Sequence, residues 1–257
     1  MNLKKELGQH LLNNLSILEK ISLMVGDAAV VVEIGPGTGN LTEYLLKNDY
    51  IEKLILIEKD PEMVEKIKLR FHDPRIVLLN LDATTINVAS FTDQKVTVVG
   101  NFPYNVGNAI IINLVEQMCR ITKIIAMLQK EVVERFCAKP KTKDYGKLTV
   151  LCGAFCNAKR IIDISPNNFT PPPKVMSSIL ELIPHGNYVS GVVYDNIIKV
   201  CNIGFGQRRK KLIPLMRRYF NEQIMSNIAL ALPNRDIRIE ELSIEQIILI
   251  AEILSKG

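Results

Sequence analysis

The chain has 257 residues, a net charge of +5 and 47% hydrophobic residues, enough apolar material for a sizeable core. No uninterrupted apolar run approaches the ~18–20 residues that a membrane span needs, and residues 1–6 lack the apolar stretch of a signal peptide. The five cysteines include no Cys-x-x-Cys pair, so we expect a soluble, cytoplasmic protein with neither a disulfide framework nor a metal site.

Strand-like runs alternate with helical patterns over most of the chain. Apolar, β-branched runs predict strands at 30–34, 53–58, 76–79, 96–100 and 121–127. Helical patterns follow the first two runs, at 40–47 and 62–71, and the second begins behind the N-cap pair Asp60-Pro61. This alternation predicts a doubly wound, Rossmann-like α/β sheet.

Later segments have a different sequence pattern. Runs at 148–154 and 178–183 predict two more strands, and 167–174, which holds three consecutive prolines, predicts an extended loop. From Tyr194 onward helical periodicity dominates. We therefore expect a large α/β domain over 1–190 and a small helical domain over 191–257, with the linker at 187–193.

A glycine-rich turn, E-I-G-P-G-T-G-N at 33–40, follows the first predicted strand. Glycines such as Gly35 and Gly37 let the backbone approach a ligand closely, at the sheet edge where α/β folds bind cofactors. Asn40 replaces the last glycine of a dinucleotide fingerprint, so the turn suits a nucleoside with an amino-acid tail. A purely structural β–α turn is the alternative.

Two acidic residues follow the next two strands. Glu58 could accept hydrogen bonds from both ribose hydroxyls of an adenosine moiety, and Asp82 could accept one from the exocyclic amine of its adenine. Alternatively, Glu58 is a solvent-facing carboxylate and Asp82 is a helix cap or turn residue. Neither acid is specific alone, but in order with the glycine turn they indicate a cofactor site.

The tetrapeptide N-F-P-Y at 101–104 ends the fourth strand. Methylation of an aromatic amine needs hydrogen-bond acceptors that orient the amine, and the side-chain oxygen of Asn101 is one such acceptor. The carbonyl of Phe102 or Pro103, held by the rigid proline ring, is another. Tyr104 offers a face for a flipped-out base. No strong base is needed, because alignment of the amine carries the catalysis; an ordinary Asn-Pro turn is the alternative.

Seven blocks in this order resemble the small-subunit rRNA adenine dimethyltransferases of the KsgA type. The blocks are L-G-Q-H-L-L (7–12), the glycine turn (33–40), N-F-P-Y (101–104), Q-K-E-V-V-E-R (129–135), Y-G-K-L (145–148), F-T-P-P-P-K-V (169–175) and F-G-Q-R-R-K (205–210). In the first block Leu11 replaces the usual phenylalanine. The resemblance covers nearly the whole chain.

The resemblance implies an S-adenosyl-L-methionine-dependent enzyme that dimethylates two adjacent adenosines in a hairpin near the 3′ end of small-subunit rRNA, with the pre-ribosomal small subunit as its partner. It also implies cofactor contacts at His10, Leu12, Gly35, Glu58, Asp82 and Asn101. The residues alone do not assign a role to His10 or Leu12. A monomer is the default expectation.

Basic residues cluster late in the chain. Between 196 and 221 there are seven and no acid, and we expect RNA contacts at Arg208, Arg209, Lys210 and Lys211. On one helix, 210 and 217, and likewise 211 and 218, would share a face. Lysines at 139, 141, 143 and 147 form a second cluster in a proline-containing loop. The alternative is a solvated helix face.

Three other functions remain open from the sequence. A large-subunit rRNA adenine methyltransferase of the macrolide-resistance type would share the fold, cofactor and chemistry. A noncatalytic assembly or transcription factor would share only the fold, and it would have no need of the N-F-P-Y tetrapeptide. An NAD-dependent oxidoreductase is disfavoured by Asn40.

Overall fold

The computed structural model describes residues 10–187, 189–234 and 236–256, so residues 7–9 of the first sequence block lie outside the described residues. The chain divides into two compact units: Met1–Val133 with Ala158–Pro184, and Glu134–Asn157 with His185–Gly257. The domain boundary expected near residue 190 lies close to the observed boundary between Pro184 and His185. The sequence did not predict that residues 134–157 also belong to the second unit. This segment belongs to the second unit because its helix packs against two helices from the end of the chain.

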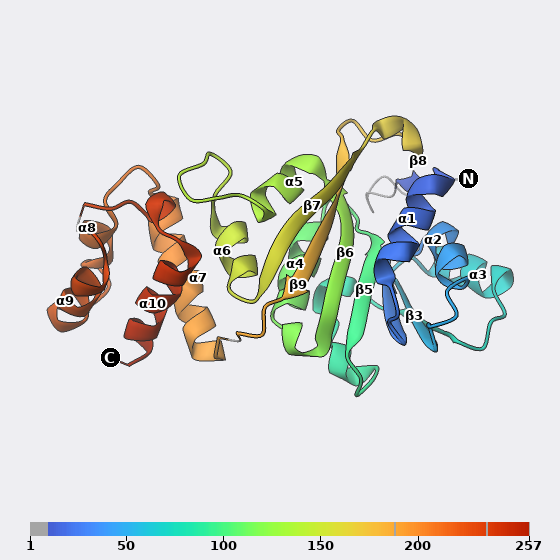
Figure 1. The fold of residues 1–257 in the computed structure, drawn as a ribbon, viewed down its shortest axis with the longest axis horizontal. Helices are drawn as coiled ribbons and strands as arrows, with labels where there is room; N and C mark the ends of the chain where they lie inside the picture. The colour runs from blue at the N-terminus through green and yellow to red at the C-terminus, as the bar shows by residue number, and fades with distance from the viewer. Residues whose placement is uncertain (1–9, 188, 235, 257) are drawn as a thin grey trace. The chain divides into compact units, whose positions relative to one another are not determined.

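A seven-stranded sheet forms the first unit, in the order β4-β3-β2-β5-β6-β9-β7 (Figure 1). The five parallel strands are β2 (Val30–Ile34), β3 (Lys53–Glu58), β4 (Ile76–Asn80), β5 (Val96–Asn101) and β6 (Ile121–Gln129). β9 (Ser177–Pro184) runs antiparallel to β6, and β7 (Cys156–Ile164) is the edge strand. The strands predicted for β2 to β6 and β9 are confirmed within two residues.

Helices cover both faces of this sheet. α1 (Leu15–Val25), α2 (Asn40–Leu45) and α3 (Pro61–Arg70) share one apolar core with alternate strand residues such as Val31 and Met127. Leu128 points to the other face, where it packs closely on Gly107 at the start of α4 (Gly107–Val115). The expected doubly wound fold is therefore confirmed, and strand order reverses between β2 and β5, where such sheets bind ligands.

One prediction at the later strands is wrong, and one strand was missed. Residues predicted as a strand at 148–154 form the helix α6 (Lys147–Gly153), whose residues 149–152 are all buried. A short apolar run does not separate a strand from a buried helix. Strand β7 was missed because it is an edge strand with a mixed polar sequence, C-N-A-K-R-I-I-D-I.

The second unit is helical. It contains α6, α7 (Gly191–Gly206), α8 (Leu212–Met216), α9 (Glu222–Ala231), α10 (Ile244–Ser255) and the last three residues of α5 (Lys130–Phe136). The single helix expected through 210–218 is wrong, because α7 ends at Gly206 and Lys211 forms an isolated β-bridge with Arg238. No helix in the described part of the chain is long and apolar enough to cross a membrane.

Candidate active site

The glycine turn after β2 has a backbone that favours glycine. Gly35, Gly37 and Gly39 have φ values of 65°, 57° and 83°, in the left-handed region. A Cβ atom on Gly37 would lie 2.9 Å from Cδ2 of Leu11. The turn therefore lies directly against the N-terminal segment, and a larger residue at 37 would separate them.

Glu58, at the end of β3, reaches across to this turn. Its Oε2 accepts a hydrogen bond from the Gly37 N–H at 3.1 Å, and its Oε1 accepts one from the Asp60 N–H at 2.9 Å. Burial raises the pKa of Glu58, while these backbone donors act in the opposite direction. The carboxylate is thus fixed in place beside Gly37, with further acceptor capacity on both oxygens.

Asp82 follows β4 and is held on both carboxylate oxygens. Oδ2 lies 2.7 Å from the Lys59 ammonium, and Oδ1 accepts from Thr84 N at 2.9 Å and Thr84 Oγ1 at 2.7 Å. The Lys59 hydrogen bond and the Thr84 donors lower the pKa of Asp82 to about 2. Asp82 is therefore both the cap of a short 3₁₀ turn and an anionic group at the sheet edge; Lys59 was not singled out from the sequence.

The side chain of Asn101 is oriented by the N-terminal segment. Its Nδ2 donates a hydrogen bond to the backbone carbonyl of His10, which leaves Oδ1 as an acceptor. The Pro103 carbonyl already accepts from Val106 N at 3.2 Å and Gly107 N at 2.8 Å. No described residue donates to the Phe102 carbonyl, so of the two carbonyls considered, that of Phe102 is the one with a free acceptor.

Tyr104 lies between two distant segments. Its ring lies 5.3 Å from the His10 ring at an interplanar angle of 34°, and its hydroxyl is hydrogen-bonded to Ser177. His10 Nδ1 lies 2.8 Å from the Pro171 carbonyl. Burial raises the pKa of Tyr104, so the phenol is neutral at physiological pH.

The N-terminal segment is pinned over the sheet edge. β1 (Leu11–Leu12) pairs with β8 (Phe169–Thr170), inside the segment predicted as a proline-rich loop. The Leu12 carbonyl also accepts from Asn40 Nδ2 at 3.0 Å. The N-terminal block, the glycine turn and the proline-rich segment are thereby joined.

One cavity collects most of the predicted site residues. It is lined by predicted residues His10, Gly35, Gly37, Glu58, Asp82, Asn101 and Pro103, together with Leu11, Lys59, Phe102, Asn105 and Val106. Leu12 lines an adjoining cavity that also includes Gly35 and Asn101. Tyr104 lines neither cavity and reaches the site through its contact with His10.

Glu33, in the adjoining cavity, was missed as a candidate. It is 1% exposed, and Thr42 Oγ1 donates to it at 2.7 Å. Burial raises its pKa to about 8. Its signal in the sequence is an acid within the otherwise apolar strand before the glycine turn.

The four predicted RNA-binding residues have different surroundings in the second unit. Arg208 pairs with Glu240, and its Nη1 and Nη2 donate to the carbonyls of Lys143 at 2.7 Å and Thr142 at 2.6 Å. Lys211 lies 2.8 Å from Asp236.

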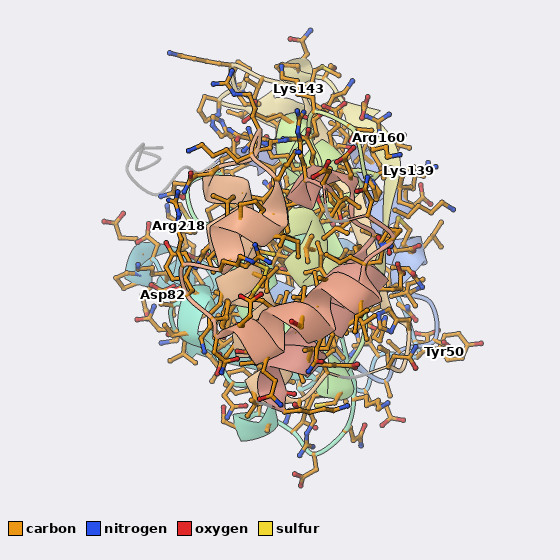
Figure 2. The ribbon with its side chains drawn as sticks, turned by 90° about the vertical axis from the view of Figure 1, so that its left-hand side faces the viewer. Tyr50, Asp82, Lys139, Lys143, Arg160 and Arg218 are labelled. Carbon is orange, nitrogen blue, oxygen red and sulfur yellow. The ribbon has the colours of Figure 1, made fainter. Side chains whose placement is uncertain are left out.

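By contrast, Arg209 and Lys210 are exposed and have no ion-pair partner among the described residues. Lys139, Lys143 and Arg218 are likewise exposed (Figure 2). Arg208 therefore ties the lysine-rich loop to the turn that follows α7.

Comparison with known proteins assigns the chain to a family. The family model "Ribosomal RNA adenine dimethylase" matches residues 1–256. This chain belongs to the ribosomal RNA adenine dimethylase family. The match confirms the resemblance found in the sequence, and members of this family are S-adenosylmethionine-dependent methyltransferases.

Relatives align over nearly the full length of this rRNA adenine dimethylase. "Ribosomal RNA small subunit methyltransferase A" of Cytophaga hutchinsonii is 35% identical, covering 98% of this chain and 97% of the relative. The protein of the same name from Coxiella burnetii is 34% identical, with 99% of each covered. A dimethyladenosine transferase structure from Plasmodium falciparum has a TM-score of 0.82 at 25% identity, covering 94% of this chain and 96% of that one.

The site fits the cofactor of the family. Gly35 and Gly37 line the cavity without side chains, and a Cβ atom at either position would reduce the space beside the turn. The Glu58 and Asp82 carboxylates line the same cavity. These groups can accept hydrogen bonds from the hydroxyls and the amine of an adenosine moiety. Among the described residues, no cluster of His, Cys, Asp or Glu could hold a metal ion.

Proposed function

We propose that this rRNA adenine dimethylase methylates the exocyclic amines of two adjacent adenosines in a hairpin near the 3′ end of small-subunit rRNA. The relatives that are 34–35% identical over nearly the whole chain are named small-subunit methyltransferases. The observation that carries the chemistry is the acceptor pair, Asn101 Oδ1 and the Phe102 carbonyl, beside the cavity that Glu58 and Asp82 line.

S-adenosylmethionine, when bound, supplies an electrophilic methyl group on its sulfonium. In our proposal Glu58 accepts hydrogen bonds from the ribose hydroxyls and Asp82 accepts one from the adenine amine. Gly35 and Gly37 allow close approach of the backbone, and His10 and Leu12 contact the cofactor from the N-terminal segment.

The target adenine is held by the end of β5. Asn101 Oδ1 and the Phe102 carbonyl accept the two N–H hydrogens of its amine and direct the nitrogen lone pair toward the methyl group. Pro103 keeps this turn rigid, and Tyr104 provides the stacking face for the flipped-out base. The amine becomes acidic once it is methylated, so its proton passes to water without a strong base.

The second unit contributes binding of the rRNA backbone. Arg209 and Lys210, with the neighbouring lysines of the 139–143 loop, provide unpaired positive charge for phosphates. We expect Lys211 to contribute less because Asp236 neutralises it, and Arg208 to act by holding the loop. The partner is then the pre-ribosomal small subunit, bound by a monomer in the cytoplasm.

The large-subunit methyltransferases are the second candidate. The 23S rRNA methyltransferase ErmE has a TM-score of 0.68 at 21% identity, which shows a shared fold. The blocks T-P-P-P-K-V (170–175) and F-G-Q-R-R-K (205–210) resemble the small-subunit branch more closely. A noncatalytic binder of the same fold would not need the acceptors at Asn101 and Phe102.

The proposal is tested with small subunits that lack the modification. The protein is incubated with them and S-adenosylmethionine carrying a labelled methyl group, and the rRNA is digested to nucleosides. We expect label in N6,N6-dimethyladenosine. Tight binding to the subunit without any label would refute catalysis and favour the noncatalytic alternative.

A further inference from the structure

Ser177 lies at the same sheet edge as the proposed active site. It is the first residue of β9, opposite Gln129 at the carboxyl end of β6, and its side chain is 0% exposed. Because β9 is antiparallel to β6, its first residue meets the carboxyl ends of the parallel strands. Asn101 ends β5 at this edge, opposite Met127.

The hydroxyl of Ser177 contacts the phenol of Tyr104 through a hydrogen bond. The Tyr104 ring also packs against His10, which is itself bonded to the Pro171 carbonyl. The orientation of Tyr104 is therefore set from β9 and from the N-terminal segment, rather than by the turn that carries it.

We propose that Ser177 is a positioning residue for methyl transfer, which holds the Tyr104 ring in the orientation on which the target adenine stacks. The inference rests on the proposed function, in which Tyr104 receives that base. A ring that is already fixed loses less rotational freedom when a base stacks on it. Misplacement of the reacting groups by about 1 Å is enough to slow a reaction strongly.

Ser178 provides a matched control. It is also 0% exposed, and its hydroxyl donates to the Ile162 carbonyl at 2.8 Å. Neighbouring residues of a strand point to opposite faces, so its hydroxyl is directed away from Tyr104. Ser178→Ala removes a buried hydroxyl and its hydrogen bonding to Ile162 and Asp163 of β7, but leaves the Tyr104 contact intact.

The experiment measures kcat and KM for methylation of unmodified small subunits, and the Kd of the cofactor by calorimetry. We expect Ser177→Ala and Tyr104→Phe each to lower kcat about 5- to 10-fold, with the cofactor Kd within about twofold of wild type. The double variant should be no slower than either single variant, because both remove the same hydrogen bond. Ser178→Ala should keep kcat within about twofold of wild type.

Three results would overturn the inference: equal kcat for Ser177→Ala and Ser178→Ala, multiplied effects in the double variant, or a cofactor Kd that rises as kcat falls. If Ser177→Ala does not fold, the Tyr104→Phe variant tests the proposal alone, because it keeps the ring and removes only the hydroxyl. An unchanged kcat in Tyr104→Phe then overturns the proposal. Wild-type protein that labels no small-subunit rRNA refutes the proposed function itself, whereas an active wild type with active variants refutes only the role of Ser177.

Discussion

Asn101 is the residue on which the proposed chemistry depends most. Its Nδ2 is bonded to the His10 carbonyl, so Oδ1 is the atom left for the target amine. We predict that Asn101→Ala lowers kcat at least about 100-fold, comparable to the loss of one preorganised hydrogen-bonding group at an active site. The cofactor Kd should rise much less, because the other cavity-lining groups remain.

The control for this substitution is Asn113→Ala in α4. The Asn113 side chain donates to the Ile86 carbonyl at 2.9 Å and does not line the cavity. Both proteins are compared in single-turnover methyl transfer and in cofactor titration. Unchanged turnover in Asn101→Ala would remove Asn101 from the mechanism.

The raised pKa of Glu33 predicts how the stability of the protein depends on pH. Its pKa is raised from 4.5 to about 8 by burial, so between these values the folded protein keeps a proton that the unfolded chain has lost. This group therefore makes the free energy of unfolding fall as pH rises from 5 to 8, by up to about 1.4 kcal/mol per pH unit.

Glu33→Gln mimics the protonated carboxyl and should remove this fall in the free energy of unfolding with pH. We expect urea denaturation to show similar stabilities near pH 5 and a variant that is increasingly more stable toward pH 8. Asp82 does not interfere, because its lowered pKa affects stability only below about pH 4. A constant difference between the two proteins across this range would mean that Glu33 is already ionised at pH 5.

Single residues at strand ends were the most predictable part of the site. Glu58, Asp82 and Asn101 follow parallel strands, and the carboxyl ends of such strands meet at one edge, so their convergence follows from the strand pattern. Lys59 and Ser177 could not be found in this way. Their contacts with Asp82 and Tyr104 depend on side-chain directions and on an antiparallel strand whose partner the sequence does not reveal.

At the scale of elements, the glycine turn and the N-terminal segment form one unit. Gly37→Ala combines a φ of 57° with a Cβ atom 2.9 Å from Leu11, so it should displace the N-terminal segment and weaken cofactor binding at least about 10-fold. Gly26→Ala is the control, since its φ of 69° is also positive and unfavourable for alanine, but its Cβ atom meets nothing within 4 Å.

Both substitutions should lower stability by at least about 1 kcal/mol, because a positive φ is unfavourable for alanine. Calorimetric titration with the cofactor separates them: we expect an unchanged Kd for Gly26→Ala. Equal cofactor affinity in the two variants would show that Leu11 does not have to lie against the turn.

The errors of prediction also belong to the element scale. The short apolar run L-T-V-L-C-G-A was predicted as a strand, but it forms a helix that packs against α7 and α10. Local propensity is weak where the partner is unknown. β1 and β8 have two residues each, and only their mutual pairing defines them.

Across the molecule, the sequence located the helical end of the chain but not the full second unit. Residues 134–157 join that unit through α6, a contact between segments far apart in sequence. Contacts between segments far apart in sequence also change the charge of the basic cluster. No acid interrupts it in sequence, yet Glu240 and Asp236 neutralise two of its members in space.

This distribution predicts how RNA binding depends on salt. Removing Arg209 and Lys210 together should flatten the plot of log K against log salt by about 2, roughly 1 for each lost phosphate contact. Lys211→Ala, the control, should change the slope less because Asp236 already pairs with Lys211. The slopes are measured with a hairpin RNA, and an unaltered slope for the double variant would make this surface a solvated face only.

The most direct test of the account compares the two ribosomal subunits as substrates. Small and large subunits, both lacking adenine dimethylation, are incubated in parallel with the protein and S-adenosylmethionine carrying a labelled methyl group, and the labelled nucleosides are mapped. The account predicts dimethyladenosine at two adjacent positions near the 3′ end of the small-subunit rRNA and no label in the large subunit. Label in the large-subunit rRNA would contradict it and make this family member an enzyme of the large-subunit branch.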